Sequence, residues 1–235
     1  MGISIRGMGR ATAALGVLLL PATASAVVLS FASSDQGWVA DTEWGDSANA
    51  FAWVSTGTVG GQGAWVAEGA PANRQTLTSP LFTVLADGPV SVSILHRYNF
   101  TAVDGDAIDG GHIRYRVNDG PWVELSVAEI GSYTDDGIDS LLFEEGWSSR
   151  SPGYDEPAYT TSTGTLGSFS QGDLLTLQFR AGWGANPADG RNWEIGSIEV
   201  SNLAAVPEPE TWALAGCVAL GAVAAVRRMR AGRGS

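Results

Sequence analysis

Recognisable arrangements of side chains that act together as acid, base or nucleophile are few in this 235-residue chain. The only histidines are His96 and His112, and they form no H-E-x-x-H zinc motif. There is no G-x-S-x-G nucleophile elbow, and the single cysteine, Cys217, lies in an apolar run near the C-terminus. We therefore expect no catalytic residue and a protein that is not an enzyme.

The adjacent carboxylates Glu144 and Glu145 leave one enzymatic alternative open. Glycosidases place two carboxyl groups on either side of the bond that they cleave, and the distance between the two groups decides the chemistry. Neighbouring side chains of a strand point to opposite faces of a sheet, which disfavours this pair. A secreted hydrolase that acts on glycans is the second alternative function.

A cluster of acidic residues is the main candidate metal site, and the acidic group at residues 135–139 is a weaker one. Asp104, Asp106 and Asp109 fall in one short segment, and hard cations such as Ca²⁺ prefer several oxygen ligands. The segment is not an EF-hand loop, because Ile108 and Tyr115 fall at its fifth and twelfth positions. The alternatives are a structural calcium ion and a solvated acidic loop, and no other cofactor is expected.

Tryptophans offer a second kind of ligand site. Trp44, Trp122 and Trp147 lie in or beside expected loops, where an exposed indole presents a flat face to a sugar ring. These three form the candidate ligand face, with packing inside the loops as the alternative. Trp183 and Trp193 fall in strand patterns and are expected in the core.

The elements that position these residues are expected to be β-strands. Apolar and polar residues alternate over 90–94, 112–117 and 175–183, which indicates strands with one face in a core. Asn118-Asp119-Gly120-Pro121 lies between two such runs and predicts a hairpin turn. Several strands at short spacing predict an all-β fold, an antiparallel sandwich over residues 27–203.

The first 26 residues have the pattern of a secretory signal peptide. Two arginines precede the apolar run Ala11–Leu20, and Ala24-Ser25-Ala26 is a small-residue cleavage site. Cleavage is expected between Ala26 and Val27. The domain that follows is then exported.

The segment 204–235 has the pattern of a C-terminal membrane anchor. Val206-Pro207-Glu208-Pro209 is expected to be extended, because proline disfavours helix at the residue before it. The apolar run 211–226 predicts a single transmembrane helix of ~24 Å. The basic tail 227–233 holds a stop-transfer cluster that should stay cytoplasmic: Arg227, Arg228 and Arg230.

This order of motif, apolar span and arginines resembles the PEP-CTERM sorting signal of Gram-negative bacteria. The resemblance implies that exosortase reads Val206, Pro207, Glu208 and Pro209 and then processes the protein. It also implies passage through the Sec translocon, cleavage by signal peptidase and transient anchoring in the inner membrane. The final location would be the outer surface or the extracellular matrix. A plain tail anchor is the alternative.

The central region resembles the jelly-roll module related to MAM domains, which occurs on proteins with varied surface anchors. The segments that resemble it are Phe31 with Gly37-Trp38, residues 77–81, His96-Arg97-Tyr98, residues 109–115, residues 118–122 and residues 175–180. The resemblance implies a noncatalytic jelly-roll sandwich for adhesion or carbohydrate contact, often with bound calcium. The chain departs from the family at two acidic calcium-ligand positions, where it has Ala32 and, after Trp193-Glu194-Ile195, Gly196.

Charge excludes one class of partner. Residues 27–205 contain seven arginines, 23 carboxylates and no lysine, a formal charge of −16. Nucleic acid is not expected as a partner, because phosphate binding needs a basic face. The expected function is adhesion or matrix contact at the cell surface or in a biofilm exopolysaccharide, with a carbohydrate-binding module as the first alternative.

Overall fold

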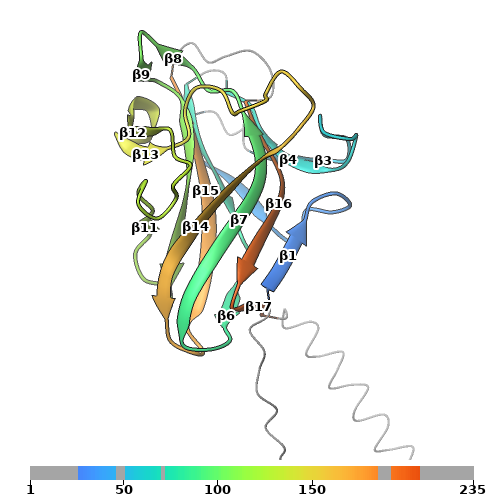
Figure 1. The fold of residues 1–235 in the computed structure, drawn as a ribbon, viewed down its shortest axis with the longest axis vertical. Helices are drawn as coiled ribbons and strands as arrows, with labels where there is room; N and C mark the ends of the chain where they lie inside the picture. Colours follow the sequence, from blue (N-terminus) through green and yellow to red (C-terminus); the bar gives the residue numbers. More distant parts are fainter. Residues whose placement is uncertain (1–25, 46–50, 70–71, 185–191, 207–235) are drawn as a thin grey trace, which may run out of the picture.

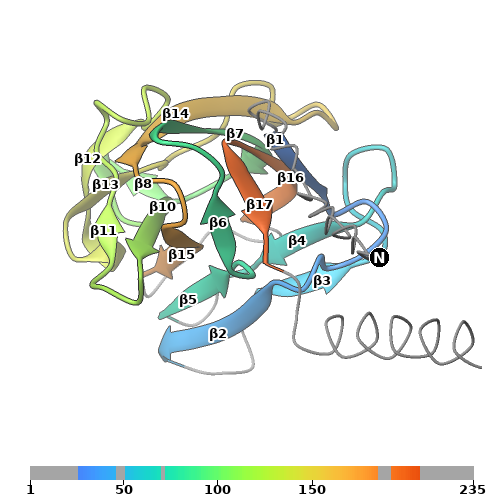
Figure 2. The same cartoon turned by 90° about the horizontal axis from the view of Figure 1, so that it is seen from below.

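The computed structural model describes residues 26–45, 51–69, 72–184 and 192–206. In these residues the chain forms two antiparallel β-sheets that pack face to face (Figure 1). The view in Figure 2 shows the two layers from below. The predicted all-β fold and antiparallel sandwich are confirmed.

Within the described residues, one layer is a six-stranded sheet with the order β14-β7-β16-β4-β3, and β1 pairs with the far half of β16. Its strands are β1 (Ala26–Ser30), β3 (Ala52–Val54), β4 (Ala64–Ala67), β7 (Gly88–Tyr98), β14 (Thr160–Phe169) and β16 (Trp193–Ser201). In β7, the predicted alternation holds: Val90, Val92 and Ile94 are buried.

The second layer, again counting described residues only, is a seven-stranded sheet with the order β11-β10-β15-β5-β2; in addition, β6 pairs with β15 and β17 pairs with β6. Its strands are β2 (Val39–Trp44), β5 (Asn73–Thr78), β6 (Phe82–Val84), β10 (Gly110–Val117), β11 (Val123–Glu124), β15 (Leu174–Trp183) and β17 (Leu203–Ala205). Asn118 and Asp119 both have positive φ between β10 and β11, which confirms the predicted hairpin turn.

Two smaller pairs extend from this framework. They are β8 (Ala102–Val103) with β9 (Asp106–Ala107), and β12 (Asp135–Ile138) with β13 (Glu144–Gly146). The 3₁₀ helix η2 (Asp139–Leu141) connects β12 to β13. A Cβ atom at Gly182 of β15 would lie 2.8 Å from the Ser140 carbonyl oxygen, so glycine lets this excursion pack directly on the seven-stranded sheet.

This excursion corrects the expectation that β15 has only one buried face. Leu175, Leu177 and Phe179 point into the core, but Gln178 and Arg180 on the opposite face are also buried. Residues that lie far away in sequence cover the second face, so the alternation along the strand could not reveal it.

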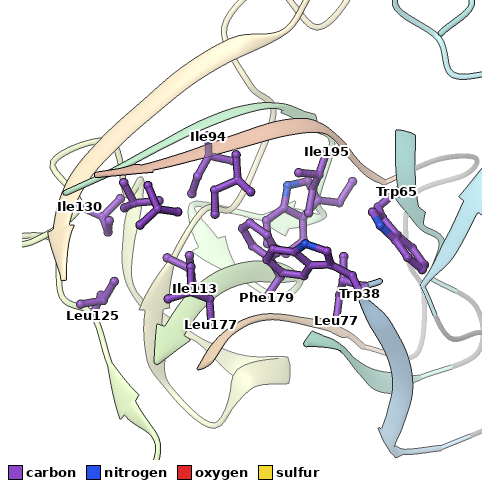
Figure 3. Packing of buried hydrophobic residues seen from close by; sticks show 14 of the residues in the cluster. Trp38, Trp65, Leu77, Ile94, Ile113, Leu125, Ile130, Leu177, Phe179 and Ile195 are labelled. Carbon is purple, nitrogen blue, oxygen red and sulfur yellow. The ribbon is translucent and has the colours of Figure 1, made fainter. Parts of the chain in front are cut away.

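Aromatic side chains join the two sheets. Phe179 of β15 meets Trp193 of β16 at a centroid distance of 5.5 Å and an interplanar angle of 86°. The ring of Trp38 stacks on that of Phe179 at a centroid distance of 5.5 Å. Ile94 of the six-stranded sheet and Ile113 of the seven-stranded sheet belong to the same core (Figure 3). Edge-to-face and offset pairs of this kind add to the stabilisation that burial alone provides.

The folded domain begins and ends close to the predicted processing sites. Ala26 is the first residue of β1 and pairs with Ser201, so cleavage after Ala26 would leave Val27–Ser30 in the strand. At the other end, β17 pairs with β6 and the Val206 N–H donates to the Leu81 carbonyl at 2.9 Å. The domain thus extends to Val206, beyond the predicted boundary at 203, because Leu203–Ala205 form a strand.

Most of the predicted export and sorting residues lie outside the described part of the chain. These are Ala24, Pro207, Glu208, Pro209, the apolar run 211–226, Arg227, Arg228 and Arg230. In the residues that the structure does describe, no helix has the length and apolar character to cross a membrane.

Candidate functional site

A buried ion-pair network lies on the outer face of the seven-stranded sheet. Arg180 of β15 donates to both carboxylate oxygens of Glu43, from Nε at 2.6 Å and from Nη2 at 2.9 Å. It also contacts Glu144 of β13 through Nη1. Burial by itself would raise the pKa of Glu43. The hydrogen bonds and positive charge of the Arg180 guanidinium outweigh burial and hold this pKa below its ordinary value. Arg180 therefore ties the edge strand β2 and the β12–β13 excursion to the centre of the sheet.

His112 lies beside this network and is fully buried. In the ladder of β10 and β15 it is directly opposite Arg180. Burial, and then the nearby Arg180 and Arg114 cations, hold the pKa of His112 well below its ordinary value, so the ring is neutral. Its Nε2 atom is 3.2 Å from Glu144 Oε2, without the alignment of a hydrogen bond.

Arginines gather on this outer face. Four of the seven arginines between residues 27 and 205 belong to its central strands: Arg74 of β5, Arg114 and Arg116 of β10, and Arg180 of β15. Their strand neighbours Leu77, Ile113 and Phe179 point into the core, so the arginines point outward. The domain is acidic as a whole, and this face is where its positive charge is concentrated.

The structure brings two of the three predicted ligand tryptophans to this same face. Trp122 contacts the guanidinium groups of Arg114 and Arg116, each 5.0 Å from the ring centroid. Trp44, which is 54% exposed, pairs in the same way with Arg74 at 5.6 Å. The two indoles belong to opposite edges of the sheet, four strand spacings or roughly 19 Å apart across it. The register also places them six residues, roughly 20 Å, apart along β15, so they are separated by roughly 28 Å.

Trp147 is not part of that face, and its prediction as an exposed ligand residue is wrong. Its side chain is fully buried, with Tyr133 4.8 Å and His96 4.5 Å away between ring centroids. A bridge pairs its backbone with Gly111. The sequence places Trp147 beside a loop, but this bridge fixes its backbone next to β10 and its side chain lies in the core.

The three aspartates of the candidate cation site do not converge. Asp104 is in the turn of the β8–β9 hairpin with φ 53°, and Asp106 is exposed beside it. Asp109 is instead buried, where its Oδ1 accepts a hydrogen bond from the Gly184 N–H at 2.6 Å. Among the described residues, no group of three His, Cys, Asp or Glu side chains could hold a metal ion.

The calcium site implied by the family resemblance also fits poorly. Ala32 has no side-chain oxygen, and its carbonyl accepts a hydrogen bond from the Gly63 N–H at 3.0 Å. At Gly196 a Cβ atom would lie 2.5 Å from the Tyr159 ring, which fills the space that an acidic side chain would need. No step of function is therefore assigned to calcium.

A pocket opens next to the arginine-rich face, between β11 and β13. Its volume is ≈ 310 Å³, and its lining residues are Glu124, Leu125, Ser126, Asp136, Phe143, Glu144 and Glu145. Phe143 is 73% exposed, and both it and Leu142 have positive φ, 67° and 65°. Bulky residues rarely adopt that conformation, and such strain is concentrated at functional positions.

Sequence reasoning did not identify Glu124 as a member of this site. Glu124 is opposite Arg114 in the β10–β11 hairpin. This pairing could have been predicted by counting residues outward from the Asn118–Gly120 turn along the two strands. Glu144 and Glu145 both line the pocket despite being neighbours, and the Glu145 side chain also accepts a hydrogen bond from the Val127 N–H. Glu124 lines the same pocket as Glu144. Burial, and then the neighbouring Glu124, raise the pKa of Glu144 to about 7 against the effect of the Arg180 cation.

No family model and no curated protein sequence matches the chain. Among solved structures, it is similar to TmCBM61 in complex with β-1,4-galactotriose, with 10% identity, a TM-score of 0.36 and coverage of 72% of this chain and 89% of that one. The chain is also similar to the VIP36 exoplasmic/lumenal domain in its Ca²⁺/Man2-bound form, with 9% identity and a TM-score of 0.33. This match covers 79% of this chain and 90% of that one.

A third similar structure is the isomalto-dextranase of Arthrobacter globiformis T6 complexed with panose, with 12% identity, a TM-score of 0.33 and coverage of 76% of this chain. The chain spans 32% of the length of that protein. Because all three likenesses are distant, the function has to be derived from the residues of this chain.

Proposed function

We propose that this protein is an exported, noncatalytic glycan-binding protein of the cell surface or the exopolysaccharide matrix. Its sandwich is a jelly roll of the MAM-related kind, and the edges of the outer face of the seven-stranded sheet that the β12–β13 excursion leaves uncovered, at Trp44 and Trp122, contact polysaccharide. The PEP-CTERM-like segment delivers it: signal peptidase removes residues 1–26, the span 211–226 holds the chain in the inner membrane, and exosortase acts at Val206–Pro209.

One observation carries the ligand assignment. Trp44 and Trp122 lie on the same outer face, and each is positioned by arginine contacts. Indoles stack on the apolar face of sugar rings, while guanidinium groups donate hydrogen bonds to sugar oxygens. Since the indoles belong to opposite edges of the sheet, a ligand that touches both is an extended polymer and not a single sugar.

The carboxylate geometry supports a noncatalytic role. Glycosidases need one carboxyl group to protonate the leaving oxygen and a second to attack the sugar or activate water. Glu144 is instead paired with Arg180, and Glu145 accepts a hydrogen bond from the Val127 N–H, so both carboxylates of the predicted pair already have partners in the fold.

Affinity electrophoresis of the full chain in detergent tests the glycan assignment. Exopolysaccharide extracted from the host matrix is cast into native gels, and migration is compared with that in plain gels. We expect retardation that is reduced at least fivefold in Trp122→Ala and in Trp44→Ala. The control is Leu95→Ala, which removes a side chain of 41% exposure from the outer face of the other sheet. Equal retardation of the control and the two tryptophan variants would contradict the proposed face.

A further inference from the structure

The outer face of the six-stranded sheet carries hydroxyl groups in a regular arrangement. In β7, Ser91 and Ser93 alternate with buried residues and therefore point outward. In β14 the exposed residues of the strand include Thr161, Thr163 and Thr165. Side chains that are short and polar thus face solvent on two neighbouring strands.

Three outward side chains form a row across the sheet. Ser93 of β7 is directly opposite Thr163 of β14 on one side and Glu199 of β16 on the other. Two strand spacings give this row a length of about 10 Å. Beside the row, the Ser91 N–H donates to the Ser201 hydroxyl at 2.9 Å, and the two hydroxyl groups share a hydrogen bond of 2.8 Å. Four hydroxyl groups and one carboxylate are therefore gathered on three strands.

These side chains line a depression in the sheet with a volume of ≈ 210 Å³. Its polar lining residues are Ser91, Ser93, Thr163, Glu199 and Ser201. Pockets that enclose a whole drug-sized ligand typically have volumes of ~300–1,000 Å³. The depression is therefore the right size for a single sugar ring and too small to enclose an oligosaccharide.

A β-bulge on each side of β7 shapes this depression. β14 has an extra residue between Thr165 and Gly167, and β16 has one between Ile195 and Ser197. Along β7, one bulge lies before the segment Ser91–Ser93 and the other lies after it. Bulges bend a strand, increase its twist and are frequent beside functional sites. The sheet thus bends at both ends of the depression.

The lining is suited to the hydroxyl groups of a neutral sugar. A serine or threonine hydroxyl both donates and accepts hydrogen bonds, and a carboxylate accepts them through two oxygens. Ser91 and Ser201 already orient each other. Glu199 has the only charged side chain among the lining residues, and residues 27–205 have a formal charge of −16. An anionic sugar would therefore be repelled.

We propose that this depression is a second glycan subsite, which holds one neutral sugar unit of a polysaccharide. Glu199 accepts hydrogen bonds from two adjacent sugar hydroxyls, and Ser93 and Thr163 bond to the others. The inference rests on the proposed glycan-binding function, in which Trp44 and Trp122 belong to the other sheet. Because the outer faces of the two sheets point away from each other (Figure 2), one molecule contacts two polysaccharide strands and cross-links them.

Affinity electrophoresis isolates the second subsite. The background is the full chain in detergent with Trp44→Ala and Trp122→Ala, and the probe is the neutral fraction of host exopolysaccharide, which anion exchange does not retain. We expect this background to keep some retardation, and the addition of Thr163→Val and Glu199→Gln to reduce what remains at least fivefold. A background variant that is not retarded at any polysaccharide concentration would overturn the second subsite.

A matched set of substitutions controls this measurement. Thr161→Val changes an exposed threonine on the same face of the same strand, and Glu156→Gln changes an exposed loop carboxylate. Neither Thr161 nor Glu156 lines the depression, so the pair should leave the remaining retardation unchanged. Equal effects of the control pair and of Thr163→Val with Glu199→Gln would overturn the assignment of the lining residues.

Light scattering measures the cross-linking. The full chain, in lipid nanodiscs that carry one copy each, should raise the scattering of a dilute solution of the neutral fraction. The two tryptophan substitutions, or Thr163→Val with Glu199→Gln, should each lower this increase at least fivefold, because one contact per molecule joins nothing. A depression variant that raises scattering as the wild type does would contradict the cross-linking.

The possible failures are distinguishable. If Trp44→Ala and Trp122→Ala weaken binding but the depression substitutions change nothing, the second subsite is wrong and the glycan-binding function stands. If the acidic fraction of the exopolysaccharide retards the tryptophan double variant more than the neutral fraction does, the neutral-sugar assignment is wrong. If neither fraction retards the wild type, both proposals are wrong.

Discussion

The indole N–H of Trp193 donates a hydrogen bond to Nδ1 of His96 over 3.0 Å in the buried centre of the sandwich. Because Nδ1 is the acceptor, the ring proton is on Nε2, which donates to the Ser162 hydroxyl at 2.7 Å. Both ring nitrogens are thus satisfied by a neutral imidazole. Burial lowers the pKa of His96 to about 3, so the ring links β7, β14 and β16 without charge.

This arrangement predicts an acid-sensitive fold. In the unfolded chain His96 takes up a proton near pH 6.5, whereas in the folded chain it does so only near pH 3. Between these values only the unfolded state binds the proton, so stability falls as pH falls, by up to about 1.4 kcal/mol for each pH unit. Urea unfolding at pH 7.5, 6.0 and 4.5 measures the loss.

His96→Gln isolates the contribution of this ring. The variant should be less stable than the wild type at pH 7.5, and the difference should shrink at pH 4.5, because glutamine does not titrate. Other acid-sensitive groups, His112 among them, are common to both proteins. A difference that stays constant from pH 7.5 to 4.5 would show that His96 is not held neutral.

Gly111 is a position where the core has no room for added volume. A Cβ atom there would lie 2.4 Å from the Trp193 ring. We expect Gly111→Ala to destabilise the fold by about 1–3 kcal/mol, because overpacking a filled core forces its neighbours to shift. Gly131→Ala is the control, since nothing lies within 4 Å of a Cβ atom at that glycine. Free energies of unfolding from denaturant titration that agree within ~0.5 kcal/mol for the two variants would refute the tight packing around Trp193.

The sorting proposal predicts a processing defect. In Pro207→Ala with Pro209→Ala, the loss of both prolines frees the motif to continue as helix, so full-length protein should accumulate in the inner membrane. The matched control replaces two exposed loop prolines, Pro152 and Pro157. Intact mass spectrometry of membrane, periplasm and medium fractions measures the products. Normal processing of the motif variant would remove the role assigned to Val206–Pro209.

The sandwich could be predicted because its signals are local. Alternation along β7 and the Asn118–Gly120 turn depend on residues a few positions apart, and both are confirmed. The same turn fixes the register of β10 and β11, and with it the position of Glu124 opposite Arg114. Trp44 and Trp122 could be named as candidates, but that they share one face follows only from the strand order.

What could not be predicted depends on distant pairing. The alternating pattern of its strand predicts that Arg180 is exposed. In the structure it is covered by Glu43 and Glu144, which lie 137 and 36 residues away in the sequence. Asp109 reads as a loop carboxylate, and its partner is the backbone of Gly184. Neither the Arg180 contacts nor the Asp109 contact could be predicted from the composition or spacing of nearby residues.

The position of the two chain ends has a mechanical consequence. Ala26 pairs with Ser201, and Val206 follows β17 close by, so the chain enters and leaves the sandwich through one end, with the β8–β9 hairpin at the other (Figure 1). A tether attached beyond Val206 therefore pulls on the end of the sandwich opposite the β8–β9 hairpin. Under the proposed glycan-binding function, such a tether leaves the exposed edges of the outer face of the seven-stranded sheet accessible to a polymer strand.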